Sequence, residues 1–179
     1  MAAAKPLPPL WLLSDARNDA ALKGALRRLP RGSGFVFRHY HLAPAERIAR
    51  FRVLARLCRA RGHMVILADS ALTACEWGAD GIYGSPRALG PRRAGLITIA
   101  TAHDLTELGA ARRMHADAVM LSPVFPTNSH PGAANLGPAR FRLLAMRAGM
   151  PVIALGGMTR AAAGRLDWPR WAAIDGLSA

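Results

Sequence analysis

The sequence contains little cysteine and no long hydrophobic run. Its two cysteines, Cys58 and Cys75, are too few for a disulfide framework or a four-thiolate zinc site, so a reducing, cytoplasmic setting is expected. No apolar run approaches the ~18 residues that a membrane-spanning helix needs. The start of the chain, which is interrupted by prolines, makes a poor signal peptide and predicts a flexible tail over residues 1–7. These absences argue against a secreted disulfide-rich protein, a zinc protein and a membrane protein.

Acidic residues and lysine are also scarce. The chain has 24 Lys and Arg against 11 Asp and Glu, for a net charge of +13, and all but Lys5 and Lys23 of the cations are arginine. Such a balance permits binding to nucleic acid or another polyanion. The arginines, however, are spread from Arg17 to Arg170 with no basic tail, which favours solvated helix faces. We therefore expect no specific nucleic-acid partner, and a basic polyanion-binding protein is the least favoured alternative.

Hydrophobic residues make up 51% of the 179 residues, which is enough for one buried core and a single domain over 1–179. Short apolar runs, typical of parallel strands covered on both faces, alternate with helical patterns. The expected strands are 8–14, 34–39, 63–69, 81–84, 96–101, 118–124, 151–155 and 171–174. The expected helices are 19–29, 44–61, 70–78, 104–115, 138–149 and 159–166. Segment 85–95 is rich in proline and glycine, and we expect it to replace a helix.

This order of elements favours a closed barrel. Strands separated by helices pair in parallel through right-handed crossovers, and eight such units can close into a ring. The last strand leaves no room for a helix after it. The predicted fold is a contracted (β/α)8 TIM barrel that lacks the last helix, and an open doubly wound sheet is the alternative. Asp104 and Thr159 are expected helix N-caps, and Gly62 and Gly149 are expected helix ends.

The helix expected over 44–61 has the clearest amphipathic pattern. Its apolar stripe is formed by Ile48, Phe51, Leu54, Ala55 and Cys58. The arginines that lie mainly off this stripe are Arg47, Arg50, Arg56 and Arg59. We therefore expect these arginines to lie on a solvated face.

Five segments, in order along the chain, resemble the thiamine phosphate synthase family, which includes the related thiazole tautomerases. They are LWLLSD (10–15), ILADSALTACEWGADGIYGSP (66–86), TAHDLTEL (101–108), LSPVFPTNSHPG (121–132) and PVIALGGMT (151–159). The most specific is the fourth, which resembles Gly-Pro-Val-Phe-Pro-Thr-x-Thr-Lys. The resemblance implies a (β/α)8 barrel with its site at the carboxyl ends of the strands.

The resemblance also implies a reaction. In this family an aminopyrimidine diphosphate, bound with Mg²⁺, meets a thiazole phosphate whose ring nitrogen displaces pyrophosphate. Thiamine phosphate is the product. A degenerate or repurposed member that only binds a thiazole or pyrimidine ligand is an alternative, as is a thiazole tautomerase-like isomerase, and a homo-oligomer is possible. Pro123 stands where the tautomerase branch carries its catalytic histidine, which argues against that branch.

Arg38 and Asp69 match the phosphate and metal positions of the family. Arg38 is expected to bind the diphosphate through its guanidinium. Asp69 is expected to be a Mg²⁺ ligand, with the N-cap of the next helix as its alternative role. The second family carboxylate falls at Pro86 or Arg87, so that magnesium ligand is missing.

His39 and His41 flank the arginine. Their alternating spacing allows both to project to one face, where a metal would need a third ligand. Two exposed loop histidines are the expectation.

The loops after the fifth and sixth strands resemble the family's substrate-binding segments. Thr101 and His103 match a hydroxyl and a histidine expected to bind substrate. Thr127 is expected at the pyrimidine end, with Asn128 beside it in a substrate-binding loop. His130 stands where the family has a lysine and is expected to act as a donor in catalysis.

The last two loops are expected to bind the thiazole phosphate. Gly156 and Gly157 expose backbone N–H groups that can cradle a phosphate. Asp175 aligns with the phosphate-binding serine of the family, although a shifted register would place Ser178 there. A carboxylate at this position would weaken phosphate binding.

Overall fold

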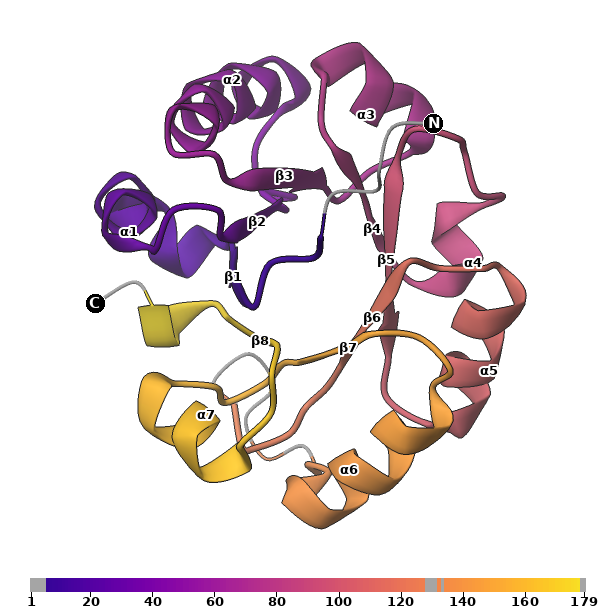
Figure 1. Ribbon diagram of the computed structural model, residues 1–179. Coiled ribbons are helices and arrows are strands. Elements are labelled where there is room, and N and C mark those ends of the chain that lie inside the picture. The colour runs from indigo at the N-terminus through magenta and orange to yellow at the C-terminus, as the bar shows by residue number, and fades with distance from the viewer. Residues whose placement is uncertain (1–5, 128–131, 133, 178–179) are drawn as a thin grey trace.

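The strands of the computed structural model, which describes residues 6–127, 132 and 134–177, form a closed parallel barrel in sequence order (Figure 1). They are β1 (Leu10–Leu13), β2 (Gly34–Phe37), β3 (Met64–Leu67), β4 (Gly81–Gly84), β5 (Ile97–Ala102), β6 (Ala118–Leu121), β7 (Val152–Ala154) and β8 (Trp171–Ala173). The ring closes where β1 pairs in parallel with β8, with Leu10 opposite Trp171. This pairing confirms the barrel and excludes the open sheet.

Helices surround the barrel, one crossing after each of the first seven strands (Figure 1). They are α1 (Leu22–Arg28), α2 (Pro44–Ala60), α3 (Ala71–Trp77), α4 (Pro86–Leu89), α5 (Leu105–Arg113), α6 (Gly137–Arg147) and α7 (Arg160–Leu166). Two 3₁₀ turns, η1 (Ala16–Ala21) and η2 (Asp175–Leu177), follow β1 and β8. In the described residues, which end at 177, β8 is followed by the 3₁₀ turn η2.

Two concentric layers of apolar side chains hold the fold together, because successive strand residues face opposite sides. Leu10 and Leu12 of β1 belong to the layer between the barrel and the helices. Trp11 and Leu13 belong to the layer inside the barrel. Trp11 fits there only because Gly34 has no side chain: a Cβ at Gly34 would lie 2.1 Å from the indole ring.

The helix boundaries largely follow the capping residues. Asp104 accepts a hydrogen bond from Glu107 N, and Thr159 accepts one from Ala162 N, so both are N-caps as predicted. Gly62 (φ +71°) and Gly149 (φ +69°) follow the ends of α2 and α6 in the left-handed conformation that favours glycine.

The expectation that segment 85–95 would replace a helix was wrong. It contains the one-turn helix α4, with Pro86 at its first position, where proline needs no N–H partner. Gly90 (φ +64°) ends the helix after one turn. The helix expected over 19–29 also begins differently, as the 3₁₀ turn η1 capped by Asp15, with α1 following.

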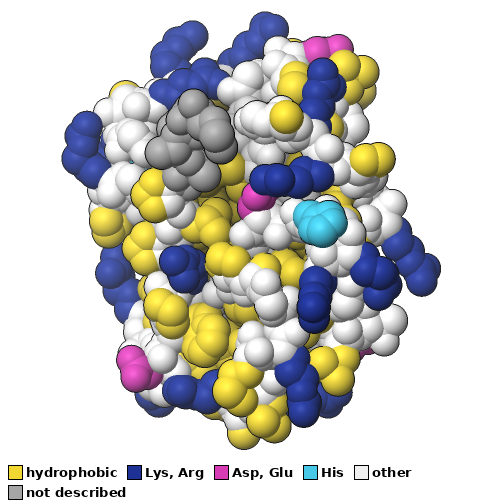
Figure 2. All heavy atoms as spheres, turned by 45° about the vertical axis from the view of Figure 1, so that its right-hand side comes forward, with side chains coloured by type: hydrophobic (Ala, Val, Ile, Leu, Met, Phe, Trp, Pro, Cys, Tyr) yellow, Lys and Arg dark blue, Asp and Glu magenta, His cyan; other side chains and the backbone are white. Residues whose placement is uncertain are grey.

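Lys and Arg side chains are scattered among apolar and uncharged groups on the face shown in Figure 2. They do not form one continuous patch on that face. In the described part of the chain, no helix is both long and apolar enough to cross a membrane.

Candidate active site

The carboxyl ends of the strands bring the predicted site residues to one rim of the barrel. Arg38 follows β2, Thr101 lies near the end of β5, and Thr127 follows β6. Gly156 and Asp175 follow β7 and β8. Positions that are up to 137 residues apart in the chain therefore meet, because all strands run in the same direction.

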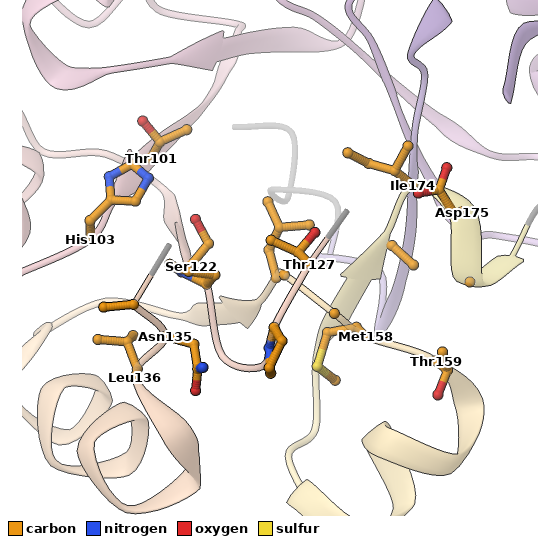
Figure 3. Close-up of a pocket in the computed structure, with 18 of the residues that line it drawn as sticks. Thr101, His103, Ser122, Thr127, Asn135, Leu136, Met158, Thr159, Ile174 and Asp175 are labelled. Carbon is orange, nitrogen blue, oxygen red and sulfur yellow. The ribbon is translucent and has the colours of Figure 1, made fainter. Parts of the chain in front are cut away.

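A cavity of about 740 Å³ opens at this rim. The predicted residues that line it are Arg38, Thr101, His103, Thr127, Gly156, Gly157 and Asp175. Figure 3 shows Thr101 and His103 on one side, Asp175 on the other, and Thr127 between them. Asp69 does not belong to the lining. Asn128, His130 and Ser178 lie outside the described residues.

The loop after β7 packs closely on the loop after β6. Gly156 (φ +94°) and Gly157 (φ +63°) adopt conformations that favour glycine. A Cβ at Gly156 would lie 2.6 Å from Pro123 Cα, and one at Gly157 would lie 2.3 Å from the Pro126 carbonyl oxygen. Among the described residues, no acceptor is found for the N–H group of either glycine. These N–H groups can therefore bind an anion in the cavity.

Alternating charges join the loops after β1, β2 and β8. Arg17 Nη1 lies 3.3 Å from Asp175 Oδ2, and Arg17 Nε donates to Asp15 Oδ1 at 2.9 Å. Arg38 Nη2 lies 3.6 Å from the other oxygen of Asp15. Asp175 is thus partly neutralised by Arg17, which reduces the repulsion expected between this carboxylate and a phosphate.

Asp69 is bound by an arginine that the sequence placed on a solvated helix face. Arg47 Nη1 donates to Asp69 Oδ2 at 2.5 Å, and the Arg47 side chain is only 12% exposed, so the expectation for Arg47 was wrong. Its long side chain reaches from α2 over the end of β3. The N-cap of α3 is Ser70 and not Asp69, because Ser70 Oγ accepts from Thr73 N.

Magnesium does not fit the residues found around Asp69. Its other oxygen, Oδ1, accepts from Ser70 N at 2.7 Å. Although burial raises the pKa of Asp69, the hydrogen bonds from Ser70 N–H and Arg47 hold it below its ordinary value. The described residues contain no group of three or more His, Cys, Asp or Glu that could hold a metal ion.

His39 is buried, which corrects the expectation of two exposed histidines. It stacks on Phe37 with ring centroids 4.5 Å apart, Nδ1 lies 2.7 Å from Ser14 Oγ, and Nε2 lies 2.6 Å from Asp19 Oδ1. Burial, opposed by Asp19, lowers the pKa of His39, which favours the neutral ring. Ser14 Oγ also accepts from Arg38 N at 2.8 Å. This Ser14–His39–Asp19 network is outside the cavity lining and fixes the backbone of Arg38.

His103 is oriented by a carboxylate. Its backbone N–H and its ring Nδ1 both lie within 2.8 Å of Glu107 Oε2. Because an ionised carboxylate only accepts hydrogen bonds, Nδ1 carries a proton. In the neutral ring, Nε2 is then left as an acceptor at the edge of the cavity.

The cavity contains polar residues that sequence reasoning missed. They are Tyr83, Ser122, Asn135 and Arg140. Burial raises the pKa of Tyr83 to about 12, so its hydroxyl stays protonated. Arg140 lies in the first turn of α6, and a helix that follows a barrel strand begins at the carboxyl rim. The position of Arg140 near the start of this helix could therefore have predicted that it lines the cavity.

Comparisons with known proteins agree with the geometry. The thiamine monophosphate synthase family model (TMP-TENI) matches residues 12–167. The thiamine-phosphate synthase of Bordetella avium is 33% identical over 86% of this chain and 73% of its own length, and that of a Mycobacterium species is 31% identical over 85% and 76%. In fold, a thiamine phosphate pyrophosphorylase from Pyrococcus furiosus superposes with a TM-score of 0.78 at 22% identity, over 95% of this chain and 87% of that one. The chain therefore belongs to the thiamine monophosphate synthase family.

Proposed function

We propose that the protein is a transferase of thiamine biosynthesis that joins an aminopyrimidine diphosphate to a thiazole phosphate. The thiazole nitrogen donates its electron pair to the methylene carbon of the pyrimidine, and a C–N bond forms. The bond between that carbon and the diphosphate oxygen breaks, and its electron pair leaves with pyrophosphate. The products are thiamine phosphate and pyrophosphate. The cavity supports this proposal because it combines cations, hydroxyls and free N–H groups around one space.

Charge on the leaving pyrophosphate must be neutralised as it develops. Arg38 and Arg140 supply permanent positive charges in the lining. We assign the pyrimidine end to the hydroxyls of Thr101 and Thr127, which line the same cavity. Since the positively charged guanidinium of Arg47 already binds Asp69, we assign no step to a magnesium ion at that carboxylate.

The phosphate of the thiazole fits the loop after β7. Gly156 and Gly157 both line the cavity, and we assign their backbone N–H groups as donors to this phosphate. His103 and Tyr83 also line the cavity and can form further hydrogen bonds to a substrate. Pro123, at the position of the tautomerase histidine, also lines the cavity and has no proton to transfer, which disfavours an isomerase.

The single observation that carries the proposal is the meeting of Arg38, Thr101, Thr127 and Gly156 in one cavity of a barrel of this family. The test is to incubate the pure protein with both substrates and to measure pyrophosphate release and thiamine phosphate formation. The expected result is equal amounts of the two products. Absence of both products, with a folded protein, would contradict the transferase.

The Arg47–Asp69 contact favours one second candidate, a member that binds a phosphorylated heterocycle without turnover. It predicts thermal stabilisation by thiazole phosphate alone and no pyrophosphate release when both substrates are present. Thermal shifts measured in parallel with product formation therefore separate the two functions.

A further inference from the structure

The guanidinium of Arg47 is fixed over the carboxyl end of β3 by hydrogen bonds from all three of its nitrogens. Nε and Nη2 donate to the carbonyl oxygen of Arg38 at 3.2 and 3.1 Å, and Nη2 also donates to that of Ala68 at 3.0 Å. Nη1 donates to Asp69 Oδ2 at 2.5 Å. A guanidinium does not lose its proton in a protein, so this is a permanent cation at a carboxylate.

Three aromatic rings surround the same guanidinium. The Arg47 Cζ atom lies 5.4 Å from the ring centroid of Trp77, 5.7 Å from that of Phe37 and 5.9 Å from that of Tyr40. All three distances are within the ~6 Å at which a ring face attracts a cation. The rings come from α3, β2 and the loop after β2, so the fold itself holds Arg47 in place.

This arrangement competes with a divalent ion for the same oxygen. Mg²⁺ requires oxygen ligands at about 2.0–2.1 Å in near-octahedral geometry. A divalent ion at Asp69 Oδ2 would lie beside the Arg47 guanidinium, which donates to the same oxygen, and the two positive charges would repel each other. The other oxygen, Oδ1, accepts from Ser70 N. Pro86 and Arg87, where the second family carboxylate falls, offer no side-chain oxygen.

We infer that Arg47 takes the place of the divalent cation at Asp69, and that the protein does not bind Mg²⁺ at this carboxylate. The cation that faces Asp69 is then part of the chain and does not depend on the metal concentration. The catalytic consequence, a turnover that needs no metal at Asp69, rests on the proposed function. The inference that Mg²⁺ does not bind at Asp69 is independent of the proposed function.

The test uses Mn²⁺ as a paramagnetic probe of a magnesium site and measures water-proton relaxation during titration of the protein. The wild-type protein and Asp69→Asn are expected to give the same change in water-proton relaxation as Mn²⁺ is added. Arg47→Met keeps much of the side-chain length and removes the charge, and it is expected to bind Mn²⁺ at least tenfold more tightly than wild type. That gain should disappear in the double variant Arg47→Met/Asp69→Asn.

Arg52→Met is the matched control, because Arg52 lies on the exposed side of the same helix. It should leave the titration unchanged. Wild-type Mn²⁺ binding that Asp69→Asn abolishes would overturn the inference, as would a folded Arg47→Met variant with no gain in affinity. Should Arg47→Met fail to fold, as judged by circular dichroism, the comparison of wild type with Asp69→Asn decides alone. None of these measurements requires turnover, so a failed activity assay leaves the result intact.

Discussion

The carboxylate of Asp175 and the guanidinium of Arg17 lie 3.3 Å apart where the loops after β8 and β1 meet. Asp175 lines the cavity, and its side chain is 48% exposed. A pair this exposed is worth only about 0.2–1 kcal/mol. The negative charge of Asp175 therefore still acts on a phosphate in the cavity.

We expect Asp175→Ser to bind thiazole phosphate roughly two- to fivefold more tightly, as judged from the exposed-pair energy. Isothermal titration calorimetry measures the change. Asp167→Asn is the control, because it removes a carboxylate at the C-terminal end of α7 and asparagine tolerates the left-handed conformation found there. Weaker binding by Asp175→Ser would show that the carboxylate helps to hold the ligand.

Arg38→Met should reduce kcat/KM for the diphosphate substrate by roughly 10- to 100-fold, because a charge-assisted hydrogen bond is worth about 1.5–3 kcal/mol. Stability should change little, since Asp15 keeps its contact with Arg17. Initial rates at varied diphosphate concentration measure this change in kcat/KM. Arg147→Met, in the last turn of α6, removes an equal charge away from the rim and should keep the wild-type rate. Equal rates for wild type and Arg38→Met would remove Arg38 from the mechanism.

Gly157→Ala should destabilise the protein by about 2 kcal/mol or more, because alanine at φ +63° is strained and its Cβ would lie 2.3 Å from the Pro126 carbonyl oxygen. The free energy of unfolding in urea measures the loss. Gly164→Ala is the matched control: it lies inside α7 with open space around the added Cβ, and alanine should stabilise the helix by about 0.5–1 kcal/mol. Similar results for the two variants would refute the close packing of the loops after β6 and β7.

His39 gives the fold a dependence on pH. Its pKa in the folded protein is below the ordinary 6.5, so the unfolded chain takes up a proton first on acidification. The contribution of His39 to the free energy of unfolding should therefore stay constant above pH 6.5 and decrease as the pH drops from 6.5 toward 5. One such group contributes at most about 1.4 kcal/mol per pH unit. Asp19 does not titrate in this range, because hydrogen bonds from His39 and Arg50 outweigh burial and keep its pKa low.

His39→Asn should reduce this slope, and asparagine suits the backbone at φ +38°. Urea unfolding at several pH values tests the slope separately from any overall loss of stability. His63 is also buried with a lowered pKa and should contribute to the slope that remains. His115→Asn serves as control, because His115 is exposed and also has a positive φ (+55°) that asparagine tolerates. An unchanged slope in His39→Asn would contradict the role given to this ring.

The barrel could be predicted because its determinants are local. Runs such as 34–39 and 63–69 are too short and too apolar for anything but buried strands, and the caps at Asp104 and Thr159 mark helix starts directly. The location of the site at the carboxyl rim could also be predicted, because the strands are parallel and their carboxyl-terminal residues lie at one end of the barrel. For this reason Arg38, Thr101 and Gly156 could be predicted to lie close together.

The partners of the site residues could not be predicted in this way. Arg47 and Asp69 are 22 residues apart, and the periodicity of α2 says only that Arg47 lies off the apolar stripe. Whether its long side chain extends into solvent or folds over the end of β3 depends on rings and carbonyl groups from other elements. The burial of His39 is a similar case, because it depends on Ser14 and Asp19.

The fit of Trp11 against Gly34 ties the evolution of two positions together. A descendant of this chain that acquires any side chain at 34 must replace the tryptophan at 11 by a smaller residue. Otherwise the new Cβ at position 34 would lie 2.1 Å from the indole ring. The substitutions should therefore occur as a pair, and a lineage carrying only the change at 34 should be rare.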